Sequence, residues 1–232
     1  MKIHLPNSAF LGNLDSFLRS FDIENPNTLE ITANKKWISL HPVALAMVAA
    51  LGLTIETKKV HFEKLEAKSK HYLERMGLFK ILGIASDIKI TEHESAGRFI
   101  PLSKIEDSEK LSYFIREIVP LLHLKPEQAE PIKYIISELV RNVFEHSGAK
   151  NGAVLCAQFY KKSNTIRIGI VDTGVGIKKS INVSYKTGSD TEAIKLALTP
   201  GITGTTRKIG GTEYNAGADG VCQWLQNIYI EH

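Results

Sequence analysis

The apolar positions between residues 131 and 148 recur at steps of three and four, which predicts an amphipathic helix. Pro131 suits the first turn of that helix, because its missing N–H would have no partner there. Gly148 suits its end. The residues of the apolar stripe are Ile132, Ile136, Leu139, Val140 and Val143.

Three polar residues of this helix, Glu138, Asn142 and Glu145, are spaced four and three apart. The spacing predicts that they share a face turned away from the apolar stripe. A carboxylate can polarise a water or a hydroxyl. An asparagine offers a neutral oxygen to Mg²⁺. Taken alone, however, such a pattern is more commonly a solvated helix face.

The pattern then changes to two extended segments. Ala153–Tyr160 and Thr165–Val171 are rich in β-branched and aromatic residues, with a turn between them. The second segment runs into Asp172 and the glycines of DTGVGI. An acid at a strand end can accept a hydrogen bond from a base amino group, and glycines let the backbone approach a planar ligand. A lone DxGxG is typical of an ordinary turn, but this order of elements is specific.

Together these motifs resemble the GHKL ATPase superfamily. ISELVRNVFEHS resembles its N box and DTGVGI its G1 box. The SELxxNxxEHS form is most similar to the serine-kinase anti-sigma factors. The resemblance covers residues 115 to 217 approximately, and it implies ATP and Mg²⁺ as cofactors.

The resemblance implies a role for each matching residue. Glu138 would be the general base, Asn142 the Mg²⁺ ligand, and Asp172 the partner of the adenine amino group. The remaining ATP-binding candidates in these two boxes are His146, Gly174, Gly176 and Ile177.

Downstream, the chain is rich in glycine and threonine. The resemblance implies that this region holds the ATP lid and the G2 box, where backbone N–H groups would hold the triphosphate. A mobile surface loop without a ligand is the alternative. The candidate residues are Gly201, Gly204, Thr205, Thr206 and Gly217.

The G2 region departs from the family pattern, Asn-Ala-Gly-x-Gly. Asp219 stands where the second glycine is expected, and only about a dozen residues follow Gly220. We therefore expect a GHKL fold that is incomplete at its C-terminus. A missing strand would expose apolar surface, and formation of a homodimer is one way to cover it.

Upstream, residues 1 to about 90 predict an alternation of strands and helices, which indicates an α/β unit. The predicted elements are Thr28–Ala33, Pro42–Gly52, Thr54–Val60 and His71–Met76. The order resembles a STAS-like domain, the fold of the anti-sigma-factor antagonists, through WISLHPVALAMVAAL and HYLERMGLF. His41-Pro42 replaces the phospho-acceptor serine of that family, which argues against phosphorylation-controlled binding. A plain α/β scaffold is the alternative to a partner-binding module.

The junction contains a predicted strand at Phe99–Ser103 and a helix at Glu109–Val119 that Pro120 would end. A further helix would begin near Pro126. We therefore expect a STAS-like regulatory domain over residues 1–98 and a GHKL domain over residues 99–232. The expected fold class is α/β (α+β), with the helices of the second domain on one face of a mixed sheet.

Composition limits the partners and the cellular locations that we expect for this protein. A net charge of +4 over 232 residues does not indicate a nucleic-acid-binding protein. Cys156 and Cys222 make no disulfide framework. The sequence shows neither a signal peptide nor a membrane span, so a cytoplasmic location and no membrane partner are expected.

Two functional hypotheses follow. In the first, the chain hydrolyses ATP or phosphorylates a serine or threonine of a partner protein, with the STAS-like domain for regulation. In the second, it is a non-catalytic interaction module that keeps the GHKL fold without efficient turnover. The departure at Asp219 favours the second.

Overall fold

A computed structural model describes residues 1–35, 38–63, 65–86, 98–122, 125–199, 202, 207–209 and 212–214. The fold is mixed α/β, with parallel and antiparallel sheets, as the sequence predicts. The chain divides into two compact units. The first comprises residues 1–129 and 151–172, and the second comprises residues 130–150 and the chain from residue 173 onward.

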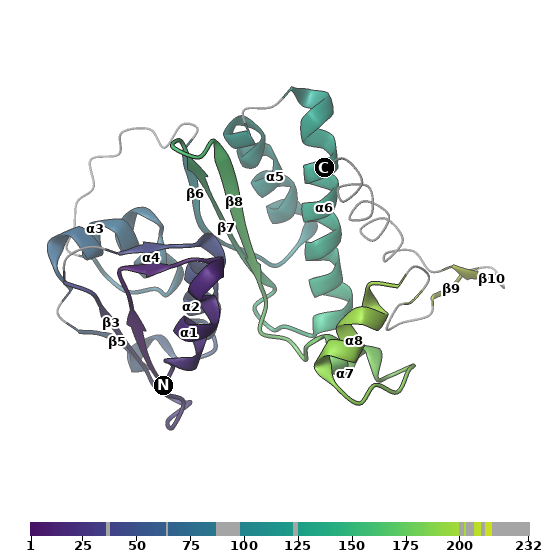
Figure 1. The fold of residues 1–232 in the computed structure, drawn as a ribbon, viewed down its shortest axis with the longest axis horizontal. Coiled ribbons are helices and arrows are strands. Elements are labelled where there is room, and N and C mark those ends of the chain that lie inside the picture. The colour runs from purple at the N-terminus through teal and green to yellow at the C-terminus, as the bar shows by residue number, and fades with distance from the viewer. Residues whose placement is uncertain are drawn as a thin grey trace. The chain divides into compact units, whose positions relative to one another are not determined.

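The first unit begins with a parallel sheet in the order β1-β3-β5, beside a short parallel pair of β2 and β4 (Figure 1). Parallel neighbours need crossover connections, and helices supply them here. The strands are β1 (Lys2–Leu5), β2 (Ser8–Ala9), β3 (Leu29–Ala33), β4 (Ser39–Leu40) and β5 (Val60–Phe62). The helical segments are η1 (Leu11–Asn13), α1 (Leu14–Arg19), α2 (Pro42–Gly52), η2 (Thr57–Lys59), α3 (Ala67–Arg75) and α4 (Leu78–Ile81).

The first unit also contains an antiparallel sheet in the order β6-β7-β8. Its strands are β6 (Phe99–Ile105), β7 (Ala153–Tyr160) and β8 (Thr165–Val171). Helix α5 (Ser108–Leu122) packs against β6 and β7. The turn between β7 and β8 contains Asn164 at a φ of 50°, a left-handed conformation that asparagine tolerates better than most residues.

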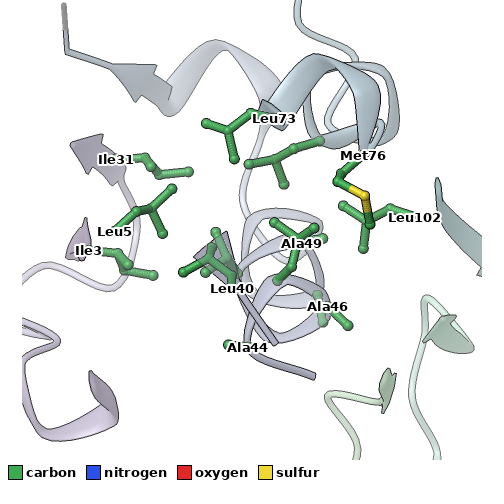
Figure 2. Packing of buried hydrophobic residues seen from close by; sticks show 14 of the residues in the cluster. Ile3, Leu5, Ile31, Leu40, Ala44, Ala46, Ala49, Leu73, Met76 and Leu102 are labelled. Carbon is green, nitrogen blue, oxygen red and sulfur yellow. The ribbon is translucent and has the colours of Figure 1, made fainter. Parts of the chain in front are cut away.

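Helix α2 joins the two sheets into one core, because it packs against β7 and β8 as well as against the N-terminal elements. Its alanines are small enough to let neighbouring backbones approach. Figure 2 shows side chains from the parallel strands, α3 and β6 converging around Ala46 and Ala49 of this helix. The predicted boundary after residue 98 is untested, but the first unit extends beyond it.

The second unit is mainly helical. Its described elements are α6 (Pro126–Asn142) from residue 130 on, the π-helical turn η3 (Val143–Ser147), α7 (Ile177–Ile181), α8 (Asp190–Ala197), β9 (Arg207–Ile209) and β10 (Thr212–Tyr214). Strands β9 and β10 pair antiparallel. Ser189 caps α8 by accepting a hydrogen bond from the Glu192 backbone N–H at 3.1 Å.

Several predicted boundaries were wrong. Pro120 and Pro131 lie inside α5 and α6 instead of ending or beginning a helix. Burial of Leu121 and Ala129 accompanies this continuation, since packing can outweigh the lost backbone hydrogen bond. The strand expected at Thr54–Val60 is β5 at Val60–Phe62, because the chain before it forms turns.

The segment 178–180, which follows the G1-box motif, belongs to helix α7. Among the described residues, no helix combines the length and the apolar character needed to cross a bilayer.

Candidate nucleotide site

Glu138 is the most unusual side chain of helix α6, because it is a carboxylate with only 3% of its surface exposed. It lies away from the buried stripe of Ile136 and Val140, as the sequence predicts, but it is not solvated. Its Oε2 accepts a hydrogen bond from the guanidinium of Arg141, one turn later. A buried carboxylate is costly without such a partner, so the solvated-face explanation is wrong for Glu138.

Asn142 ends helix α6 and is half-buried. The next five residues form a π-helical turn, a rare geometry that is frequent at functional sites. The turn contains Glu145 and His146, whose Oε2 and Nε2 atoms lie 4.0 Å apart. Gly148, at a φ of 62°, ends the turn, as predicted.

Residues 174–177 of the second unit, called the glycine segment below, lie next to this π-helical turn. The backbone N–H of Val175 donates a hydrogen bond of 2.8 Å to the carbonyl oxygen of Ser147. Gly176 has a φ of 80°, a conformation that glycine adopts without strain. Helix α7 then begins at Ile177. The N-box helix end and the segment from Gly174 to Ile177 are therefore neighbours within the second unit.

Asp172 directly follows β8 and closes the first unit, where it is half-buried. The sequence predicted a buried acid at the end of this strand. The strand end is confirmed, while the side chain keeps some access to solvent.

A pocket of about 520 Å³ adjoins the glycine segment within the second unit. Its lining residues combine two cations and two apolar side chains with one amide and one acid. They are Val175, Lys178, Lys179, Asn182, Val183 and Asp190. Lys178 donates a hydrogen bond of 3.2 Å to the carbonyl oxygen of Gly188. The amide, the acid and the lysines of this lining are polar groups of the kind that orient a small polar ligand.

The lid candidates Gly201, Gly204, Thr205, Thr206 and Gly217 lie outside the described residues, and so does Asp219. In the part of the chain that the structure describes, no three His, Cys, Asp or Glu side chains gather into a metal-binding group. The oxygens of Glu138 and Asn142 are nevertheless the hard donors that Mg²⁺ prefers.

Sequence reasoning missed the partner of Glu138 and the lysines of the pocket. Arg141 follows Glu138 by three residues, which is a spacing that brings side chains together on a helix. That spacing was therefore a usable signal. The π-helical turn has no comparable signal in the sequence.

The chain matches no known protein family and no solved structure. It is 27% identical over 164 residues to the RNA-directed RNA polymerase L of Dobrava-Belgrade orthohantavirus. The match covers 68% of this chain and 7% of that polymerase. The likeness thus concerns a small part of a much longer protein.

Proposed function

We propose that the chain is a Mg-ATP-binding signalling protein of the GHKL type, which hydrolyses ATP or phosphorylates a serine or threonine of a partner protein. The observation that carries this proposal is the buried carboxylate of Glu138. It lies one turn before Asn142, and the π-helical turn that follows is hydrogen-bonded to the glycine segment. A buried acid at a motif position is a better sign of a functional role than a solvated one, because burial of a carboxylate is costly.

In this function, Glu138 accepts the proton of the attacking water or hydroxyl. Arg141 holds the carboxylate in one orientation through their ion pair. Asn142 would hold Mg²⁺, which supplies positive charge to the phosphate oxygens when bound with ATP. Asp172 would accept a hydrogen bond from the adenine amino group.

The remaining candidates complete the proposed nucleotide site. Gly174, Gly176 and Ile177 would shape the adenine pocket, and His146 would contact ATP. The residues Gly201, Gly204, Thr205, Thr206 and Gly217 would form the lid. The lysines beside the glycine segment, Lys178 and Lys179, are cations suited to phosphate.

The finer fold assignment belongs to the same proposal. Residues 1–98 would form a STAS-like domain that binds a regulatory protein, and its parallel strands with crossover helices are consistent with that fold. Residues 99–232 would form the GHKL domain, supported by an antiparallel sheet and the helices α5 and α6. Such a protein would act in the cytoplasm.

One observation favours the non-catalytic alternative. The ion pair with Arg141 engages the Glu138 carboxylate, and an oxygen that a guanidinium occupies is less available to take a proton from water. If that pair persists when ATP binds, the protein would bind nucleotide and signal by its conformation, without turnover.

Calorimetric titration with ATP and ADP, with and without Mg²⁺, tests the proposal. Asp172→Asn should weaken both nucleotides by roughly 10- to 100-fold, since it removes one charge-assisted hydrogen bond. Asn142→Ala should weaken only the Mg²⁺-dependent part of ATP binding. The matched control is Asp15→Asn, an exposed change in α1. Absence of nucleotide binding by the parent chain, or unchanged binding by both variants, would refute the proposal.

A further inference from the structure

A second pocket, of about 550 Å³, lies within the first unit at the start of helix α2. It shares no residue with the proposed nucleotide site. Its lining is mostly apolar, with one cation and one imidazole. The lining residues are Phe10, Leu11, Gly12, His41, Val43, Ile166, Arg167 and Ile168.

Arg167 is held in this pocket by aromatic rings instead of by an acid. Its guanidinium carbon lies 4.7 Å from the centroid of the Phe10 ring and 4.6 Å from that of Tyr160. Among the described residues, no carboxylate lies within 4.0 Å of the Arg167 side chain, and no side chain or carbonyl accepts a hydrogen bond from it. Stacked rings contact the guanidinium without using its five N–H donors.

His41 supplies a second donor. Its side chain is buried, with 5% of the residue exposed, and its Nδ1 accepts a hydrogen bond of 3.1 Å from the Val43 backbone N–H. Burial lowers the pKa of His41, and the charge of Arg167 lowers it further, so the imidazole is neutral near pH 7. Because Nδ1 accepts, the ring proton is on Nε2, which has no hydrogen-bond partner among the described residues.

We propose that this pocket binds a small organic carboxylate. The planar N–H fork of Arg167 matches a carboxylate, and the Nε2–H of His41 provides a neutral donor beside it. The side chains of Leu11, Val43 and Ile168 provide the apolar wall for the hydrocarbon part of the ligand.

The lining distinguishes this ligand from inorganic phosphate. Inorganic phosphate carries more charge and more acceptor oxygens than one arginine and one neutral imidazole match, and it has no hydrocarbon part to pack against the apolar wall. None of the described residues that line the pocket is an acid, which would repel an anion. The volume is typical of sites for small molecules.

Calorimetric titration of the full chain with acetate, hexanoate, benzoate and inorganic phosphate tests the proposal. Hexanoate and benzoate should bind more tightly than acetate, and phosphate should bind most weakly. Arg167→Gln should weaken the carboxylates by at least about tenfold, because it removes the charge. Arg116→Gln should leave binding unchanged, because Arg116 is also stacked on a ring, that of Tyr113, but lies outside the pocket.

A second variant keeps the proposal testable if Arg167→Gln does not fold. Leu11 is 68% exposed, so Leu11→Asn should leave the fold intact. It should weaken hexanoate several-fold and leave acetate unchanged, because it removes only apolar contact. Circular dichroism of each variant verifies the fold.

Three results would overturn the proposal. In the first, no carboxylate of the panel binds the parent chain. In the second, Arg167→Gln, or Leu11→Asn if the arginine variant is unfolded, binds hexanoate as the parent does. In the third, phosphate binds more tightly than every carboxylate, which would assign the pocket to a different anion.

Discussion

Helices α2 and α6 differ in how they meet the interior of the protein. Helix α2, PVALAMVAALG, has no charged residue and is buried along most of its length. Helix α6 is amphipathic and carries the buried carboxylate of Glu138. Burial of α2 is favourable through apolar contact alone. Burial of Glu138 is unfavourable unless its charge is balanced, so its position requires a reason beyond packing.

The close packing of α2 depends on a glycine in the neighbouring sheet. A Cβ at Gly169 of β8 would lie 2.4 Å from the carbonyl carbon of Pro42 and 2.5 Å from the backbone nitrogen of Val43. The Sγ of Cys156 on β7 also lies 3.3 Å from the Pro42 carbonyl oxygen. The start of α2 therefore rests directly on the backbone of the antiparallel sheet.

Among the variants that test this difference between α2 and α6, Gly169→Ala is expected to have the largest effect on stability. The added methyl would meet backbone atoms that cannot move aside, so the free energy of unfolding should fall by about 1–3 kcal/mol. Urea denaturation measures the loss. Gly12→Ala is the matched control and should change little, because, apart from Gly12 and its two chain neighbours, no described residue has an atom within 4 Å of the position that the added methyl would take. Equal stability of the two variants would show that α2 does not pack on β8 in this way.

A smaller effect on stability is expected when the ion pair between Glu138 and Arg141 of α6 is broken. Arg141→Gln should lower the free energy of unfolding by about 1 kcal/mol, since it leaves the Glu138 charge buried while the half-exposed arginine limits the loss. Lys133→Gln breaks the ion pair with Glu130, whose carboxylate is exposed, at the same spacing on the same helix, and it should change stability by less than about 0.5 kcal/mol. Similar losses for both variants in urea denaturation would mean that Glu138 is not buried as described.

The smallest effect concerns the first turn of α2. The pKa of His41 is lowered by burial and by Arg167, so below about pH 6.5 the unfolded chain binds a proton that the folded chain resists. Stability should therefore fall as the pH drops below that value. His41→Asn keeps a side-chain acceptor for the Val43 N–H and should reduce this pH dependence. Thermal melts of both proteins between about pH 5.5 and 7.5 measure the difference. If the melting temperature depends on pH in the same way for both proteins, His41 is not the source of the pH dependence.

The sequence predicted those elements whose pattern is local. Helix α2 runs from Pro42 to Gly52, and strands β7 and β8 have the predicted ends. Apolar periodicity and turn residues determine such segments directly. The helix boundaries predicted from Pro120 and Pro131 were wrong, because a proline is tolerated inside a helix when tertiary packing supports the neighbouring turns.

The sequence predicted which residues make up the candidate site, but it did not predict the burial and contacts of their side chains. The spacing of Glu138 and Asn142 and the glycines after Asp172 could be read from the sequence. The burial of Glu138 cannot be read from the residue pattern of its helix, because the charged positions of such a helix are expected to face solvent. For the same reason, the contact between Gly169 and Pro42 had no local signal.

The most direct test of the central claim is single-turnover hydrolysis of Mg-ATP by the parent chain and by Glu138→Gln. Because glutamine keeps the shape of the side chain and removes the base, Mg-ATP should still bind while the rate falls by about 10²–10⁴-fold. Urea denaturation should show that the variant is at least as stable as Arg141→Gln. A parent chain that binds ATP without turnover, or a Glu138→Gln variant as fast as the parent, would contradict the assignment of Glu138 as the catalytic base.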